Sequence, residues 1–198
     1  HKSFENGGIK IFQQHFNSLY QLANLGISLD IKAFIQIGSS DEYGEKKGPI
    51  DEEMRESPIS PYSLAKLTAT HYLINCFKQG LLNTVVLRPF LVFGEMQSKN
   101  RFLPYLIDNC IKNKEFNVTK GEQKRDYLYI KDFNRALLKS LTTESAYGEI
   151  LNIASGQPRT IKKVIGNVKK IIGKGKPVLG GLKYREGESM ELYANIEK

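Results

Sequence analysis

Two short apolar segments with a helix between them constrain the fold of this chain more than any other feature. Residues 33–37 (AFIQI) and 84–88 (TVVLR) are mostly apolar, and Pro89 closes the second run. The segment between them has Ser60 as a suitable helix cap and Pro61 at the first helical position. A strand, a helix and a second apolar strand in this order predict a parallel sheet that is covered on both faces.

The remaining elements continue this alternation. Helices are expected at about 11–25, 61–79, 101–113, 131–143 and 160–172, and short strands at about 126–130 and 149–153. The first helix should end near Gly26, because glycine commonly follows the last turn of a helix. With 40% hydrophobic and 25% charged residues, the 198-residue chain has an ordinary globular composition. The predicted fold class is therefore α/β, with a doubly wound parallel sheet.

The glycine-rich motif that is expected at the start of such a sheet does not occur in this sequence. A doubly wound nucleotide-binding sheet normally opens with a strand, a glycine-rich turn and a helix that holds the pyrophosphate. The chain contains neither G-x-x-G-x-x-G nor G-x-G-x-x-G, and it stops in residues 193–198 without a closing helix. We therefore expect a Rossmann-like sheet whose N-terminal part is absent, together with a smaller α/β substrate-binding region.

Tyr62 and Lys66 lie four residues apart on the helix that begins at Pro61, so they share one helix face. The Tyr-x-x-x-Lys spacing occurs three times, at Tyr43/Lys47, Tyr62/Lys66 and Tyr127/Lys131. The first pair falls in a polar turn. The third begins in a strand-like run, where residues four apart are ~13 Å from each other. Only the middle pair follows a helix start, and the simpler alternative for it is an exposed Tyr–Lys pair without a function.

A phenol beside an ammonium group suits proton transfer to or from a hydroxyl that becomes a carbonyl. The reference pKa of a phenol is about 10, so lowering it by ~3 units requires roughly 4 kcal/mol of preferential stabilisation of the phenolate. A cation held a few ångströms away in a partly closed site can supply this stabilisation. The polar turn at residues 38–44 could bring a serine hydroxyl to the same place.

The excess of basic over acidic residues, 29 against 21, gives a net charge of +8. The lysines are scattered through the expected helices rather than gathered with aromatic residues in one stripe, which argues against a nucleic-acid-binding module. A solvated basic surface explains them better. Its field would also favour a small substrate that carries phosphate groups.

The cysteines and histidines exclude further classes of protein. Cys76 and Cys110 are too few for a disulfide framework, and we expect both to be reduced residues in or near the core of a cytoplasmic protein. His1, His15 and His71 have no metal-ligand spacing with the cysteines, so no metal site is expected. No run approaches the ~18 apolar residues of a membrane span, and no membrane partner is expected.

Six short motifs follow one another between residues 38 and 198. They are GSSDEYG at 38–44, PYSLAK at 61–66, LRPFLVFG at 87–94, GEQKRDYLYIKD at 121–132, NIASG at 152–156 and REGE at 185–188. In this order they resemble the NAD(P)-dependent epimerase/dehydratase family, the extended short-chain dehydrogenases that act on nucleotide sugars. The resemblance implies that roughly 80–100 residues with the glycine fingerprint and the adenosine pocket are absent.

The resemblance implies roles for individual residues. Tyr62 would be the acid/base on the sugar hydroxyl, Lys66 would hold the nicotinamide ribose and lower the pKa of the phenol, and Ser39 would hydrogen-bond the reacting oxygen. Asp41 would complete the catalytic set. The expected cofactor is NAD or NADP, with contacts to Gly38, Tyr62, Lys66, Pro89 and Phe90, and the expected diphosphate-sugar contacts are Ser40, Arg125 and Arg185.

Several of these residues have simpler alternatives. Ser39 could satisfy backbone groups at a strand end, and the arginines could form surface ion pairs. Where the family has N-x-x-G-T, this chain reads QHFNSL at 14–19, so that His15 occupies the asparagine position by register and Asn17 would occupy it after a slip. That position is left open.

The resemblance also implies an organisation and an assembly. We expect residues 1–89 and 123–155 to form the partial dinucleotide-binding domain, and residues 90–122 and 156–198 to form the substrate-binding region. Members of the family often dimerise through a four-helix bundle, so a homodimer through the helix at 11–25 and the Pro61 helix is expected.

The residues after Ser39 bear on which reaction follows hydride transfer at C4 of the sugar. A 4,6-dehydratase needs a further acid and base, commonly an acidic pair, but these two positions read Ser40 and Asp41. A 4-epimerase or a 4-ketoreductase is therefore preferred, with the dehydratase as the alternative. The simpler interpretation of Asp41 is a turn residue that bonds backbone amides. A non-catalytic nucleotide-sugar-binding protein is the alternative from another class, and the presence of Tyr62 and Lys66 argues against it.

Overall fold

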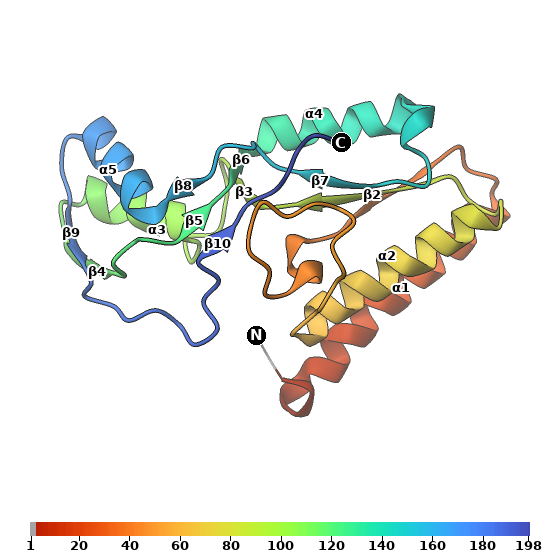
Figure 1. Cartoon of the computed structure of the whole chain (residues 1–198), viewed down its shortest axis with the longest axis horizontal. Helices are drawn as coiled ribbons and strands as arrows, with labels where there is room; N and C mark the ends of the chain where they lie inside the picture. Colours follow the sequence, from red (N-terminus) through yellow and green to blue (C-terminus); the bar gives the residue numbers. More distant parts are fainter. Residues whose placement is uncertain (1–2) are drawn as a thin grey trace.

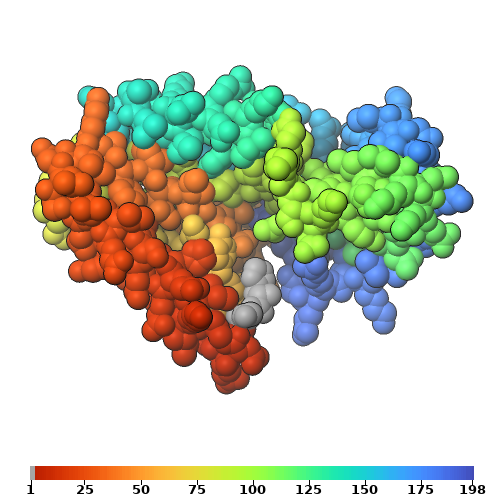
Figure 2. Space-filling view, turned by 180° about the vertical axis from the view of Figure 1, so that it is seen from behind, coloured from red at the N-terminus to blue at the C-terminus, as the bar shows by residue number. Residues whose placement is uncertain are grey.

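The computed structural model describes residues 3–198, which form two lobes side by side (Figure 1). One lobe contains a three-stranded sheet between helices, and the other contains two helices and several short strand pairs. Figure 2 shows the lobes from behind, with the red, orange and teal segments in the first and the green and blue segments in the second.

The central sheet consists of three parallel strands in the order β1-β2-β7, namely β1 (Phe34–Ile37), β2 (Thr84–Pro89) and β7 (Ile150–Ile153). Successive side chains of a strand point to opposite faces of its sheet. Val86 accordingly packs in the core on one face, whereas Val85 and Leu87 pack in the core on the other. The prediction of a parallel sheet covered on both faces is confirmed.

Helices α1 (Ile9–Ser28) and α2 (Pro61–Lys78) cover one face of this sheet, and α4 (Ile130–Thr142) covers the other (Figure 1). The caps of α2 follow the sequence signals. Ser60 Oγ accepts a hydrogen bond from Ser63 N at 3.1 Å, and Gly80, just beyond the last turn, has a φ of 70° that favours glycine.

Helix α1 ends near Gly26, as predicted, but it continues to Ser28, so Gly26 is not the residue that ends it. Gly26 is buried inside the helix, where a Cβ would lie 2.8 Å from Ile31 Cδ1. Its role is close packing rather than termination. The residue that takes positive φ (48°) in the following turn is Asp30.

The second lobe contains short strands, of which only β6 was predicted. Parallel pairs are formed by β3 (Leu91–Phe93) with β6 (Tyr127–Tyr129) and by β4 (Glu115–Val118) with β9 (Lys176–Leu179). A third small sheet has the order β10-β5-β8, from β10 (Glu191–Leu192), β5 (Lys124–Arg125) and β8 (Arg159–Thr160). Helices α3 (Phe102–Ile111) and α5 (Ile161–Ile172) pack together on the core of this lobe, around Leu106 and Phe116. The predicted strand at 126–130 is present as β6, at Tyr127–Tyr129, and β5 precedes it as a separate strand.

Three short helical segments complete the fold, namely η1 (Phe4–Gly8), η2 (Ser40–Tyr43) and η3 (Glu144–Ala146). Cys76 and Cys110 are buried and free, as predicted for core residues. Within residues 3–198, no helix combines the length and the hydropathy that a membrane span requires.

Candidate active site

A cleft of about 790 Å³ opens at the carboxyl ends of β1 and β2, with walls from both lobes. This edge of a parallel sheet is where ligands bind in doubly wound folds. The cleft is lined by every predicted site residue except Arg125, that is by Gly38, Ser39, Ser40, Asp41, Tyr62, Lys66, Pro89, Phe90 and Arg185. Predicted residues from four separate segments of the sequence therefore meet at one place.

The turn at residues 38–44 after β1, called the serine turn below, is held by the fully buried carboxylate of Glu42. Glu42 Oε1 accepts a hydrogen bond from Ser39 N at 2.8 Å, and Ser39 Oγ accepts one from Asp41 N at 3.1 Å. Glu42 Oε2 accepts from Thr70 Oγ1 of α2 and from Arg88 Nε of β2, both at 2.8 Å. The turn is thereby fastened to the helix that carries Tyr62 and to the neighbouring strand.

Tyr62 and Lys66 extend from the first two turns of α2 into the cleft. Lys66 Nζ donates a hydrogen bond of 2.8 Å to the carbonyl oxygen of Ile37, the last residue of β1. The same nitrogen lies 5.8 Å from the centroid of the Tyr62 ring. The helix face predicted from the spacing therefore exists, and the ammonium group lies beside the phenol ring.

The expected lowering of the Tyr62 pKa does not occur in this structure. Burial raises the pKa of Tyr62, and the charges of Asp41 and Glu42 raise it further, while the Ser39 hydroxyl and the charge of Arg101 lower it. Burial also lowers the pKa of Lys66, against an upward effect of Glu42. The expectation was wrong because spacing places the cation near the ring but says nothing about desolvation, which here is the largest contribution.

Asp41 also lines the cleft, and its pKa is shifted from the ordinary value. Burial raises the pKa of its carboxyl group, and the positive charge of Arg101 opposes this effect. Arg101 lies immediately before α3 and lines the same cleft. The adjacent carboxylate, Glu42, is fully buried behind the turn and is not part of the cleft wall. Only one of the two consecutive carboxylates is therefore available to a ligand.

Arg125 lines an adjoining hollow of about 390 Å³ rather than the cleft itself. The two share part of their walls, including Tyr127 and Arg185. The Arg125 side chain is largely buried and forms a 2.5 Å ion pair with Glu188. Arg185 is exposed and lines both spaces. The two arginines predicted to bind a diphosphate thus border connected parts of one surface.

His15, one of the two residues considered for the open position on α1, lies beside Tyr62. The His15 ring lies edge-on to the Tyr62 ring, with centroids 5.2 Å apart. Burial and the charge of Lys66 lower the pKa of His15. The His15 side chain is therefore in contact with the candidate acid/base.

Several cleft residues were not predicted, among them Arg101 and Tyr127. Arg101 has no local motif around it. Tyr127 falls inside the GEQKRDYLYIKD motif, and its position next to Arg125 was a signal that could have identified it.

A search against models of protein families matches residues 4–154 to the "NAD dependent epimerase/dehydratase family". The chain belongs to this family. The matched residues include the serine turn, the Tyr62 helix and Arg125 of this epimerase/dehydratase chain, whereas Arg185 lies beyond them.

Relatives of this epimerase/dehydratase chain differ in the reactions that their names state. An uncharacterized UDP-glucose epimerase of Bacillus subtilis (strain 168) is 32% identical over 137 residues, 68% of this chain and 43% of that protein. A dTDP-glucose 4,6-dehydratase of Neisseria gonorrhoeae is 30% identical over 139 residues, 68% of this chain and 40% of that protein. The chain therefore spans less than half of the length of these two curated relatives.

A solved structure has the same fold over almost the whole chain. It is the UDP-glucuronic acid 4-epimerase from Bacillus cereus in complex with UDP-glucuronic acid and NAD, with a TM-score of 0.81 and 30% sequence identity. The match covers 92% of this chain and 58% of that one. The architecture described above is therefore that of the epimerase/dehydratase family.

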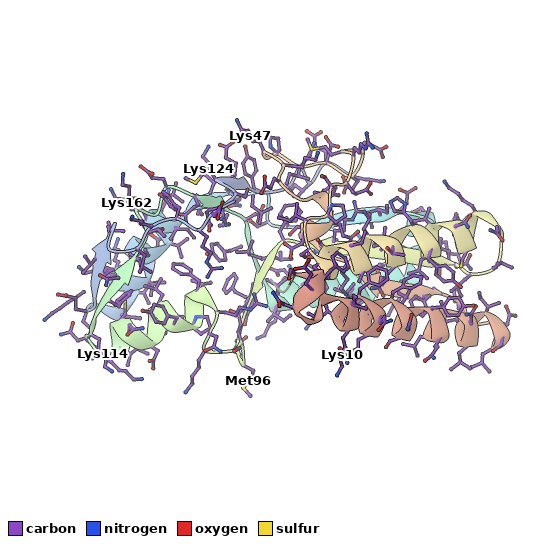
Figure 3. The ribbon with its side chains drawn as sticks, turned by 90° about the horizontal axis from the view of Figure 1, so that it is seen from below. Lys10, Lys47, Met96, Lys114, Lys124 and Lys162 are labelled. Atoms are coloured by element: carbon purple, nitrogen blue, oxygen red, sulfur yellow. The ribbon has the colours of Figure 1, made fainter. Side chains whose placement is uncertain are left out.

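The basic surface is dispersed over both lobes. Figure 3 shows Lys10 on α1 and Lys47, Lys114, Lys124 and Lys162 projecting outward from other segments around the molecule. The labelled lysines belong to segments of both lobes, and the interpretation of the net charge of +8 as a solvated surface stays a prediction.

Proposed function

We propose that this chain is part of an enzyme that transfers a hydride at C4 of a nucleotide sugar, with NAD or NADP as cofactor, and that acts as a 4-epimerase or a 4-ketoreductase. The observation that carries the proposal is the meeting of Ser39, Tyr62 and Lys66 at the carboxyl ends of two parallel strands. The UDP-sugar and NAD bound by the B. cereus relative support this class of substrate and cofactor.

The residues at the strand ends fit a nicotinamide cofactor. Lys66 Nζ makes a single protein hydrogen bond among residues 3–198, to Ile37 O, and so can donate its other N–H groups to ribose hydroxyls. Gly38 permits a close approach at the end of β1, and Pro89 and Phe90 form an apolar wall. When bound, the nicotinamide would supply the hydride chemistry at C4.

Tyr62 would exchange the proton of the C4 hydroxyl, and Ser39 would hydrogen-bond the same oxygen. Because burial raises the pKa of Tyr62, the phenol is protonated at neutral pH and is the proton donor that reduction of a 4-keto sugar requires. Epimerisation also requires the phenol to accept that proton. For this step the charge of Lys66 would have to favour the phenolate more strongly than it does in this structure.

Arg125 and Arg185 would hold the diphosphate of the substrate. Guanidinium groups bind phosphate oxygens with paired hydrogen bonds, and the two arginines border the hollow next to the cleft. Ser40 lines the cleft beside the proposed sugar position. We propose the division expected above, with residues 1–89 and 123–155 on the cofactor side and residues 90–122 and 156–198 on the substrate side.

One feature favours a 4,6-dehydratase as a second candidate. Asp41 lines the cleft, and burial raises the pKa of its carboxyl group, as suits a group that moves protons near neutral pH. Against this candidate, Ser40 cannot act as a carboxylic acid, and Glu42 is engaged by three hydrogen bonds behind the turn. A dehydratase would therefore have to work with Asp41 as its one cleft carboxylate from this turn.

The test is incubation of the full-length protein with NAD or NADP and a panel of UDP-, GDP-, CDP- and dTDP-hexoses and their 4-keto forms. Consumption of reduced cofactor in equal amount to the product would identify a ketoreductase. A stereoisomer formed without net change of the cofactor would identify an epimerase, and a 4-keto-6-deoxy product would identify the dehydratase instead.

Tyr62→Phe is the control for the site. It removes the proton donor and keeps the ring that packs against His15. Turnover should fall by at least ~100-fold, the usual contribution of a positioned acid or base. If no member of the panel reacts, or if Tyr62→Phe turns over like the wild type, the proposal of an enzyme with this site is wrong and a binding protein becomes the better description.

We propose a homodimer formed through α1 and α2, in the cytoplasm. Leu22 and Leu25 of α1 lie on one side of the helix and are about half exposed, at 57% and 53%, which leaves apolar surface available to a partner. The two buried, free cysteines suit a reducing compartment. Light scattering of the wild type and of Leu25→Glu tests the dimer, since a monomeric wild type would contradict it.

A further inference from the structure

One buried polar group of the cleft has no part in the reaction proposed above. Tyr127 lies in β6, and its hydroxyl is buried without a hydrogen-bond partner among residues 3–198. A buried donor that lacks a partner costs free energy, and most such groups in native proteins are paired. An unpaired hydroxyl next to a binding cleft therefore points to a partner that a ligand supplies.

The position of Tyr127 indicates where that partner would be. Its side chain is part of the wall of the cleft that holds Tyr62 and of the hollow that holds Arg125. The ring is fixed from the side by Phe93, with centroids 6.3 Å apart and the planes nearly perpendicular. A ligand that extends from the cleft into the hollow passes this ring.

The chemistry of the hydroxyl restricts the kind of ligand atom. Burial raises the pKa of Tyr127 to about 12, and the positive charge of Arg125 acts in the opposite direction. The phenol therefore remains protonated at physiological pH and can donate a hydrogen bond, but it cannot act as a base there. Because the field of Arg125 reaches the phenol, an anionic oxygen that pairs with Arg125 would lie near both groups.

We propose that the Tyr127 hydroxyl donates a hydrogen bond to a phosphate oxygen of the nucleotide diphosphate sugar, at the junction of the cleft and the hollow. This inference rests on the proposed function and adds a binding residue to it. The phosphate oxygen supplies the acceptor that the buried hydroxyl lacks within the described part of the chain.

The chain contains a matched control. The hydroxyl of Tyr147 is also buried and without a partner in the described residues, but its ring packs in the core of the first lobe beside Val85 and Leu87. Tyr147 lines neither the cleft nor the hollow. Replacement of either tyrosine by phenylalanine removes an unpaired buried hydroxyl, but only Tyr127 belongs to the walls of the cleft and the hollow.

The experiment compares the wild type, Tyr127→Phe and Tyr147→Phe by isothermal titration calorimetry with UDP, GDP, CDP and dTDP. Tyr127→Phe should weaken binding of the preferred nucleotide by roughly three- to tenfold, the value of one hydrogen bond, while Tyr147→Phe binds like the wild type. With the corresponding nucleoside, which has no phosphate, the two variants should bind equally. Urea unfolding should show both variants at least as stable as the wild type.

Two results would overturn the inference and leave the proposed function standing. In the first, Tyr127→Phe binds the nucleotide as tightly as the wild type. In the second, both variants lose affinity equally or lose it together with stability. If the wild type binds none of the four nucleotides, the proposed function itself fails and the inference fails with it.

Discussion

Neutralising Glu42 should destabilise this protein more than removal of any exposed charge, and the contacts of Glu42 allow the size of the effect to be worked out. Glu42 and Arg88 are both fully buried, and Arg88 Nη2 lies 2.8 Å from Glu42 Oε2. In Glu42→Gln, an amide NH₂ replaces one carboxylate oxygen and faces groups that are themselves donors. Arg88 would keep Glu56 as its remaining carboxylate, at 2.9 Å.

Breaking a buried ion pair by removal of one partner costs ~3–5 kcal/mol, and because Glu56 still compensates part of the Arg88 charge we expect about 3 kcal/mol. With a urea m-value of ~1–3 kcal/mol per molar, the unfolding midpoint should fall by roughly 1–3 M. Turnover should fall as well, because Glu42 also holds the backbone of Ser39.

Asp108→Asn is the matched control, since it neutralises a carboxylate whose ion pair with Lys112 is about half exposed on both sides. It should leave the unfolding midpoint unchanged. If Glu42→Gln unfolds at the same urea concentration as Asp108→Asn, the buried network does not stabilise the serine turn and the reasoning from burial is refuted.

Three further predictions concern the same site. Because burial raises the pKa of Asp41, the charged carboxylate destabilises the folded state, and Asp41→Asn should raise the free energy of unfolding at pH 7–8. This gain should vanish below pH 3.8, the ordinary pKa of the group, so an equal gain at pH 3 would contradict the argument. A proton NMR titration should place the pKa of His15 below the ordinary value of 6.5, and Lys66→Met should move it upward; an unchanged midpoint in that variant would mean that Lys66 does not act on His15. Gly38→Ala should destabilise the protein by ~1–3 kcal/mol, because the new Cβ would lie 2.5 Å from Glu42 Oε1. Gly166→Ala on α5 should instead stabilise it by ~0.5–1 kcal/mol, because no atom lies within 4 Å of the new Cβ, and urea unfolding of the two variants tests both signs.

The elements that local signals predicted are those whose hydrogen bonds and caps lie within one segment. Ser60 and Pro61 start α2 as expected, because the cap and the first turn are made by neighbouring residues. The strands of the central sheet were found because they are buried on both faces and therefore read as apolar runs. The helix face shared by Tyr62 and Lys66 followed from the same kind of local geometry, since residues four apart on a helix are neighbours.

Apart from β6, the short strands of the second lobe could not be found in this way. β5 and β10 have two residues each, and Arg125 pairs with Leu192, far along the chain. Such a strand obtains its hydrogen bonds from a distant partner rather than from its own residues, so it has no periodic pattern to recognise. The role of Gly26 in α1 was missed for a related reason, because its close contact with Ile31 exists only once the chain has folded back.

For the candidate site, the sequence alone was enough to predict Ser39, Tyr62, Lys66 and the serine turn as site residues, and to predict the parallel sheet next to them. Folding alone decided which of two consecutive carboxylates faces a ligand: Asp41 lines the cleft, and Glu42 is buried behind it. Folding also reversed the expected shift of the Tyr62 pKa, placed the His15 ring against Tyr62 and brought Tyr127 to the cleft wall. The physical reason is common to all of these. The spacing of residues along a chain determines which side chains can meet on one element. Burial shifts their pKa values and can leave a hydroxyl without water, and it depends on every segment packed around them.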